Sequence, residues 1–159
     1  MKLGIIIICY NIESSIDILQ SSIYINELTN LEICLVNNCS DDNTYELLKE
    51  VKEQCSNVSV VNIKKFKTEN SAVKAGARYM SSQFNLKYIG YINIENEQSN
   101  LSLLIKAVHD HQEGIINHIQ NITKSKAIKL TMFQSLFSIM EYLSNNKKNI
   151  QYSEFQYFN

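Results

Sequence analysis

Short continuous runs of apolar residues recur along the chain and predict buried strands. The first run, Leu3 to Cys9, is an almost unbroken series of isoleucines. It shows no alternation with polar residues, which is typical of a strand covered on both faces of a sheet. Three further runs have a similar character and length, and they cover residues 31–36, 58–63 and 88–92. We therefore expect at least four buried strands.

The segments between these runs carry apolar residues at helical spacing. Ile16, Leu19 and Ile23 recur every three or four residues, and this predicts an amphipathic helix. Asn43 and Glu46 have the spacing of a capping box, in which both side chains satisfy free amides at a helix start. We expect helices over 14–28, 43–54, 70–83 and 101–112, and a fifth strand over 115–119. This alternation predicts an α/β fold, a three-layer sandwich with a mostly parallel central sheet.

The pattern changes after about residue 123. An apolar stripe at helical spacing runs from Leu130 to Leu143 and predicts a helix. Two interpretations stay open, because the stripe is suited either to packing on the chain's own sheet or to a homodimer or partner-subunit interface through residues 130–143. The tail over 150–159 contains four aromatic residues, which favours a docked strand.

Composition narrows the classes of function. The 159 residues include 15 Lys and Arg against 16 Asp and Glu, for a net charge of -1, which excludes a generic basic nucleic-acid binder. No apolar run approaches the roughly 18–20 residues that cross a bilayer, and no secretion signal is visible. We expect a cytoplasmic protein with its four cysteines reduced. Four glycines provide neither a P-loop nor a dinucleotide-binding fingerprint.

Polar segments follow each of the four expected strands. In an open parallel sheet, ligands bind beyond the carboxyl ends of the strands, and these segments all fall on that edge. A groove with amide, hydroxyl and carboxylate groups suits a nucleotide base and ribose, and nearby lysines and Arg78 suit phosphate. The segments are 10–13, 37–42, the basic loop 64–67, and 93–97.

Four motifs, in order and at similar intervals, resemble family 2 glycosyltransferases of the GT-A fold. Residues 7–13 (IICYNIE) are similar to the V-I-P-x-Y-N-E-E turn, and residues 35–44 (LVNNCSDDNT) resemble V-V-D-D-G-S-T-D-G-T. Residues 71–76 (SAVKAG) match the A-A-x-N-x-G helix, and residues 91–96 (YINIEN) stand where the family has F-L-D-x-D-D. The resemblance covers about residues 3–119 and implies the fold and a nucleotide-sugar donor, UDP- or GDP-linked.

The resemblance also implies roles for individual residues. Candidate nucleotide-binding residues, at positions that match the motifs, are Tyr10, Asn11, Asn37, Asn38, Lys74 and Asn93. Glu95 is the candidate ligand for Mg²⁺ or Mn²⁺, the cations that such enzymes use to stabilise a diphosphate leaving group. No catalytic residue is assigned.

Several positions depart from the family pattern. Asparagines stand at 37, 38 and 93 where the family has aspartates, Cys39 replaces a glycine and Ile8 replaces a proline.

We expect one domain over 1–159, with a nucleotide-binding half over 1–120 and a C-terminal helix and aromatic tail over 121–159 in place of the acceptor half. Activity is left open: a divergent glycosyltransferase, with a role such as cell-surface polysaccharide or glycan biosynthesis, or a catalytically inactive GT-A-like binding or partner domain without metal and acceptor sites. An unrelated α/β binding domain is the third hypothesis.

Overall fold

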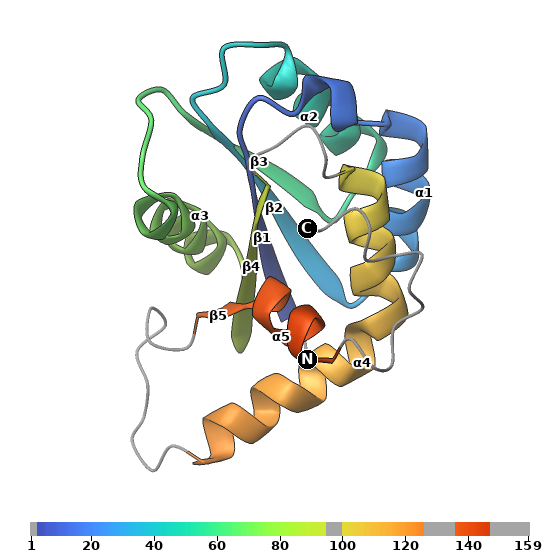
Figure 1. Cartoon of the computed structure of the whole chain (residues 1–159), viewed down its shortest axis with the longest axis vertical. Helices are drawn as coiled ribbons and strands as arrows, with labels where there is room; N and C mark the ends of the chain where they lie inside the picture. Colours follow the sequence, from blue (N-terminus) through green and yellow to red (C-terminus); the bar gives the residue numbers. More distant parts are fainter. Residues whose placement is uncertain (1–2, 95–99, 126–135, 147–159) are drawn as a thin grey trace.

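The computed structural model describes residues 3–94, 100–125 and 136–146. These residues form a parallel sheet with helices on both faces, which confirms the predicted α/β class (Figure 1). The strands are β1 (Leu3–Cys9), β2 (Leu31–Asn38), β3 (Val58–Ile63), β4 (Tyr88–Ile94) and β5 (Phe137–Ser138). The helices are α1 (Ile18–Glu27), α2 (Thr44–Gln54), α3 (Glu69–Gln83), α4 (Leu101–Ser125) and α5 (Ile139–Asn145), and a single 3-10 turn, η1 (Glu13–Ser15), precedes α1.

The strand order is β3-β2-β1-β4-β5, and each neighbouring pair is parallel. β1 lies in the middle and pairs along its whole length with β2 and with β4. At its end, Cys9 lies opposite Asn37 on one side and Ile94 on the other. The carboxyl ends of β1, β2 and β4 therefore lie side by side, as the sequence predicted.

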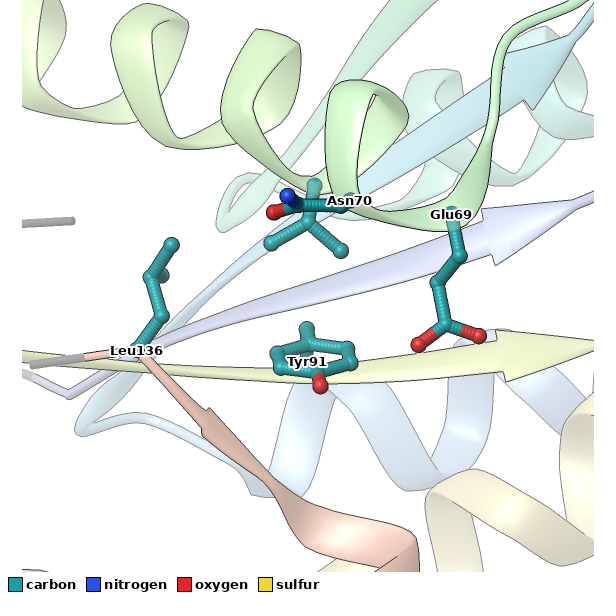
Figure 2. A pocket seen from close by; sticks show the side chains of 5 residues that line it. Glu69, Asn70, Tyr91 and Leu136 are labelled. Atoms are coloured by element: carbon teal, nitrogen blue, oxygen red, sulfur yellow. The ribbon is translucent and has the colours of Figure 1, made fainter. Parts of the chain in front are cut away.

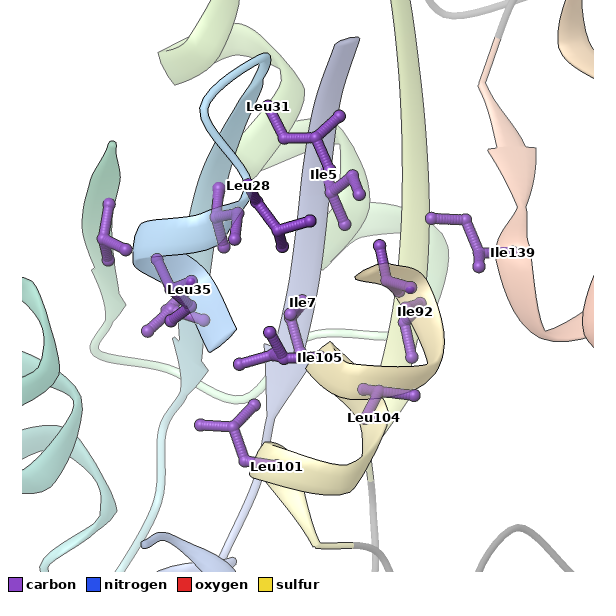
Figure 3. Packing of buried hydrophobic residues seen from close by; sticks show 14 of the residues in the cluster. Ile5, Ile7, Leu28, Leu31, Leu35, Ile92, Leu101, Leu104, Ile105 and Ile139 are labelled. Carbon is purple, nitrogen blue, oxygen red and sulfur yellow. The ribbon is translucent and has the colours of Figure 1, made fainter. Parts of the chain in front are cut away.

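Two clusters of buried apolar side chains occupy the two faces of the sheet. On one face, which α1, α2, α4 and α5 cover, Ile5 and Ile7 of β1 pack in the same cluster as Ile105 of α4 (Figure 3). On the other face, Ile6 of β1 packs in a cluster with Ala77 of α3 (Figure 1). Because alternate side chains of β1 enter opposite clusters, the strand has no solvent face. This accounts for its lack of polar positions.

Local capping explains where the helices begin. α1 starts at Ile18, because the Asp17 side chain accepts a hydrogen bond from the amide of Gln20 at 2.9 Å. The expected start at residue 14 is wrong, since residues 13–15 form η1 instead. In the same way, Thr68 accepts a bond from the amide of Ser71 at the start of α3.

The capping box predicted for α2 is wrong. Asn43 stands at the N-cap position, but its side chain makes no capping hydrogen bond. Asp42 does this instead, because its Oδ1 accepts from the amide of Thr44 at 3.0 Å. Glu46 pairs with Lys49, one turn further along the helix.

The fifth strand expected over 115–119 is wrong, because these residues belong to α4. Ile115 and Ile119 are buried four residues apart on the face of α4 that joins the larger core cluster. A short apolar segment suits a strand or a helix equally, and here the periodicity of the preceding residues continues. α4 also runs unbroken through residue 120, the expected boundary between the two halves. Across the described parts of the chain, no helix combines the length and hydropathy that a membrane span needs.

The helix expected over 130–143 is wrong in its middle. Phe137 and Ser138 form β5, which pairs with β4, and α5 begins only at Ile139. Residues 130–135 of this stripe and the tail 150–159 lie outside the described residues. Ile139 and Leu143 are buried in the larger core cluster, so the described part of the stripe packs on the chain's own sheet.

The four cysteines are free thiols in the structure. Cys9, Cys34 and Cys55 are buried, and Cys39 is partly exposed. Burial raises the pKa of Cys34 to about 12. Burial, followed by the charge of Cys34, raises the pKa of Cys9 still further. Both thiols therefore stay protonated and act as small apolar core groups.

Two glycines allow helices and strands to approach closely. A Cβ on Gly76 of α3 would lie 2.9 Å from Cγ2 of Ile6 and 3.1 Å from Cγ2 of Val36. A Cβ on Gly90 of β4 would lie 2.5 Å from the Phe137 ring. Side chains at these two positions would push α3 away from β1 and β2, and β5 away from β4.

We predict that Gly76→Val lowers the free energy of unfolding by about 1–3 kcal/mol, because extra carbon atoms in a packed core force side chains and backbone to shift. Urea denaturation measures this loss. Ser82→Val, at an exposed position of α3, is the control for the lower helix propensity of valine. Equal losses in the two variants would contradict the close approach at Gly76.

Candidate functional site

The carboxyl edge of the sheet brings together the turn after β1 and the loop after β2. The amide of Asn11 donates to Oγ of Ser40 at 3.0 Å, and Oδ1 of Asn11 accepts from the amide of Asp41 at 2.8 Å. Asn11 and Cys39 both have left-handed backbone, with φ of 48° and 60°. Asparagine tolerates this conformation well, whereas cysteine is strained where the family pattern has a glycine. The two loops thus hold each other in bent conformations.

A second set of bonds ties the same loops at the start of α2. Oδ2 of Asp42 accepts from the amide of Glu13 at 3.1 Å, while the Glu13 carboxylate accepts from the backbone and side-chain amides of Asn43, at 3.2 and 2.9 Å. The amide of Ile12 donates to Oγ1 of Thr44 at 2.9 Å. Glu13 and Asp42 therefore serve as structural acceptors for backbone amides.

Asp42 is the centre of this network. Partial burial by itself would raise its pKa, but hydrogen bonds from Thr44 and Glu13 outweigh burial and lower the pKa below its ordinary value of 3.8. The bonds stabilise the charged form because an ionised carboxylate accepts more strongly than a neutral one.

The asparagines at the end of β2 have buried, engaged side chains. Nδ2 of Asn37 donates to Oδ1 of Asn62 on β3 at 2.8 Å, and its Oδ1 accepts from the amide of Ser40 at 3.4 Å. Nδ2 of Asn38 donates to the carbonyl of Lys67 at 2.9 Å, and its Oδ1 accepts from the amide of Lys67 at 3.0 Å. Each residue is 3% exposed. Each carboxamide thus holds a neighbouring segment. Aspartates, which the family pattern has at these positions, have no N–H group to donate to the Asn62 oxygen or the Lys67 carbonyl.

Tyr10 forms an aromatic pair with Phe66 at the same edge. The two ring centroids lie 5.0 Å apart in an edge-to-face arrangement, and Phe66 is 55% exposed. The loop that carries Phe66 also carries exposed Lys64, Lys65 and Lys67. This part of the edge thus carries an exposed aromatic ring and three exposed cations in one short loop.

Asn93 lies at the end of β4 and reaches α3. Its Nδ2 donates to Oε2 of Glu69 at 2.8 Å. Lys74, the other candidate on this side, is half-buried further along α3. Glu95 lies outside the described residues. The structure therefore brings the turn residues Tyr10 and Asn11 close to Asn37 and Asn38, the last residues of β2. It also links Asn93 to α3.

The expected divalent metal requires anionic oxygen ligands. At the end of β4 the described donors are one carboxylate, Glu69, and one neutral carboxamide, Asn93. Across the described ranges, no group of three or more His, Cys, Asp or Glu side chains is placed to hold a metal ion. These donors alone do not fit a hard divalent cation.

A pocket opens on the α3 side, close to Asn93. It has a volume of about 230 Å³ and is lined by Glu69, Asn70 and Val73 of α3, Tyr91 of β4, and Leu136 (Figure 2). Figure 2 shows the Glu69 carboxylate and the Tyr91 ring on the two sides of the opening between α3 and β4. Burial first, and then the negative charges of Glu69 and Glu141, raise the pKa of Tyr91.

Sequence reasoning missed three residues of this edge: Asn62, Phe66 and Glu69. Phe66 was visible as an aromatic residue among lysines in a loop. Asn62 and Glu69 gave no signal, because their roles depend on contacts with residues 24 or more positions away.

Comparison with known proteins identifies the family. The sequence model described as glycosyl transferase family 2 matches residues 4–127, which is most of the chain. The chain belongs to glycosyl transferase family 2. This confirms the resemblance that the four motifs carry. No curated protein matches the sequence.

Solved structures with similarity to this family 2 chain include S. aureus TarS. The chain is 19% identical to TarS, with a TM-score of 0.48, and the match covers 71% of this chain and 20% of that one. For TarS 1-349 in complex with UDP, the values are 20% identity, a TM-score of 0.48, and coverage of 71% and 32%. The complex of TarS 1-349 with UDP-GlcNAc gives 19%, 0.47, and coverage of 71% and 32%. The chain thus spans a fifth to a third of these structures' length.

We predict that Asn38→Asp in this family 2 domain lowers the free energy of unfolding at pH 7 by about 1–3 kcal/mol, because a buried carboxylate faces the Lys67 carbonyl without a donor. Urea denaturation measures this loss. Asn26→Asp, an exposed position with a longer bond of 3.4 Å to the Gln54 carbonyl, is the control. Unchanged stability of Asn38→Asp would contradict a structural role for the carboxamide.

Asp42→Asn should remove a pH-dependent contribution to stability. Because the folded pKa of Asp42 is depressed, the charged form stabilises the fold above the ordinary pKa, and this contribution is lost as the pH falls through the folded pKa. The variant should therefore be less stable than wild type at pH 7, and the difference should shrink below about pH 4. Denaturant titrations at a series of pH values test this. Asp41→Asn is the matched control, because Asp41 contributes its backbone amide to the network. A difference that is constant with pH would refute the role of the Asp42 charge.

Proposed function

We propose that this chain binds a nucleoside-diphosphate sugar at the carboxyl edge of its sheet and acts in glycosyl transfer. The observation that carries the proposal is the family match over residues 4–127, which spans β1 to β4 and the loops at their carboxyl ends. A role in cell-surface polysaccharide or glycan biosynthesis is the biological setting that we infer for this activity.

The Tyr10–Phe66 pair is the proposed base-binding surface. The exposed Phe66 ring provides apolar contact for a flat base, and its edge-to-face contact with Tyr10 holds it in place. The ties between Asn11, Ser40 and Asp41 hold the Tyr10 turn, so little ordering is needed when the nucleotide binds.

The basic loop is the proposed diphosphate-binding element. Lys64, Lys65 and Lys67 are exposed, and the backbone of Lys67 is held in both directions by Asn38. Cationic side chains on a loop that is fixed in position bind phosphate oxygens well. Lys74 of α3 is a further candidate on the same side.

A divalent metal would require a ligand beyond the described donors. Mg²⁺ or Mn²⁺ at the end of β4 needs Glu95 as an additional carboxylate, with Asn93 as a weak carbonyl ligand. When bound, such a cation supplies charge stabilisation to the diphosphate. The lysines of the loop supply positive charge of their own, so we infer that the nucleotide binds with or without the metal.

The rest of the organisation is proposed on the same basis. We place the nucleotide-binding half over 1–120 and a C-terminal part over 121–159. The buried free thiols are suited to a reducing compartment such as the cytoplasm. A homodimer or partner subunit through the 130–143 segment would have to use residues other than Ile139 and Leu143, which lie in the core.

A second candidate is a non-catalytic binding domain. Its support is the use of both Asn37 and Asn38 for internal hydrogen bonds at positions where the family pattern has aspartates. In this case the chain binds a nucleotide or a partner without transferring a sugar.

Calorimetric titration with UDP and with GDP, with and without Mn²⁺, tests the proposed function. We expect micromolar binding of one nucleotide, and weakening of about 5- to 150-fold in Phe66→Ala, since aromatic contact with a base is worth roughly 1–3 kcal/mol. Leu19→Ala is the matched control, because Leu19 is an exposed apolar residue on α1 that lies outside the aromatic pair.

The outcomes separate the two candidates. Release of UDP or GDP from a nucleotide sugar supports glycosyl transfer, whereas nucleotide binding without release under any condition supports the non-catalytic domain. Failure of every nucleotide to bind refutes the proposed nucleotide site.

A further inference from the structure

The pocket beneath α3 is distinct from the aromatic and basic loops of the nucleotide edge. Its walls come from the first two turns of α3, from Tyr91 in the middle of β4, and from Leu136 just before β5 (Figure 2). The Asn93–Glu69 bond lies at the end of β4 and links the pocket to the carboxyl edge. A ligand group in this pocket would thus sit beside a substrate that is bound at the edge.

The walls combine two kinds of surface. Tyr91, Val73 and Leu136 provide an aromatic face and aliphatic carbon, whereas Glu69 and Asn70 provide a carboxylate and a carboxamide. The volume of about 230 Å³ is below the roughly 300–1,000 Å³ of pockets for drug-sized ligands. A whole nucleotide sugar is therefore too large for the pocket, and a single small ring is the appropriate size.

Glu69 is held in position by the structure. Its Oε2 accepts from Nδ2 of Asn93 at 2.8 Å, so the carboxylate is anchored to the end of β4 although it belongs to α3. A carboxylate offers about four acceptor positions on its two oxygens, and a single bond to an amide leaves acceptor capacity for ligand hydroxyls. Because this carboxylate is already held in place, little side-chain entropy is lost when it binds a ligand.

Tyr91 complements this acceptor as a donor. Its phenol carries an O–H donor, and its ring lines the same pocket as the Glu69 carboxylate. The pocket therefore offers a strong acceptor at Glu69, a donor at Tyr91, and both functions in the Asn70 carboxamide. A neutral ring with one apolar C–H face and several hydroxyl groups at its edge matches this combination.

We propose that the pocket of Glu69, Asn70 and Tyr91 binds a single pyranose ring, with Glu69 accepting hydrogen bonds from its hydroxyl groups and Tyr91 covering its apolar face. This inference rests on the proposed function, for which it defines the sugar-binding part. The ring is either the sugar of the nucleotide donor or a sugar of the acceptor. Glu69 is a binding residue in both cases.

Saturation-transfer NMR on the full chain with free glucose, galactose, N-acetylglucosamine and glucosamine tests the proposal. We expect weak binding of at least one neutral sugar, with a dissociation constant on the order of millimolar. Glu69→Gln should weaken it about tenfold, because a charged acceptor is lost while an amide oxygen can still accept from Asn93. Glu53→Gln, an exposed glutamate on α2, is the matched control.

A second pair of variants keeps the test independent of folding defects. Tyr91→Leu removes the aromatic face, and Asn70→Ala removes an exposed carboxamide with little effect on the core. Both should weaken sugar binding while thermal melting stays cooperative. Equal sugar binding in wild type, Glu69→Gln and Asn70→Ala, or binding of none of the sugars, would overturn the proposal. Binding of glucosamine alone would also overturn it and indicate an ammonium site.

Titration with UDP and UDP-GlcNAc identifies the source of the ring. Tighter binding of UDP-GlcNAc than of UDP, lost in Glu69→Gln while UDP binding is unchanged, assigns the pocket to the donor sugar. Binding of free sugar without this difference assigns it to the acceptor. Failure of both UDP and GDP to bind refutes the nucleotide site, and the NMR result with free sugars still decides the pocket by itself.

Discussion

The parallel pairing of β1 with β2 and β4 is the constraint on which the rest of the structure depends. It makes β1 a central strand with no free edge, and helices on each side of the sheet bury its two faces. It also ends the three strands at one edge, so that turns distant in sequence become neighbours. The reciprocal bonds between Asn11, Ser40 and Asp41 form only because those strand ends are aligned.

Much of this architecture follows from periodicity, and the failures have physical causes. The buried strands β1 to β4 were predictable because continuous apolar runs bounded by polar turns have few alternatives. The segment 115–119 was ambiguous, since Ile115 and Ile119 suit one face of a helix as well as a strand. β5 is two residues long and depends on the small size of Gly90, a tertiary contact that no local pattern reveals. For the same reason, the sequence did not show that a strand, β5, occupies Phe137 and Ser138 within the apolar stripe.

The candidate site shows a similar division. The order of polar turns at the sheet edge was predictable, because parallel strands place their carboxyl ends together. The use of each side chain was not, since Asn37 and Asn38 look like ligand-facing amides in the sequence but are buried and bonded to β3 and the basic loop. Glu69 shows the opposite case: it looks like an ordinary first-turn glutamate, yet it is joined to β4 by Asn93. Glu69 therefore supplies a carboxylate at this edge, whereas the motif positions Asn37 and Asn38 supply none.

The paired bonds between Asn38 and Lys67 have a structural consequence beyond stability. A carboxamide has the same donor and acceptor atoms as a peptide unit, and here it bonds to one residue's amide and carbonyl as a neighbouring strand does. The Asn38 side chain thus attaches the loop after β3 to the end of β2, four residues beyond the last backbone pair of the two strands, Asn38 and Ile63. Because this attachment carries no charge, it does not titrate, and the loop stays joined to the sheet while the charges of its lysines respond to pH and salt.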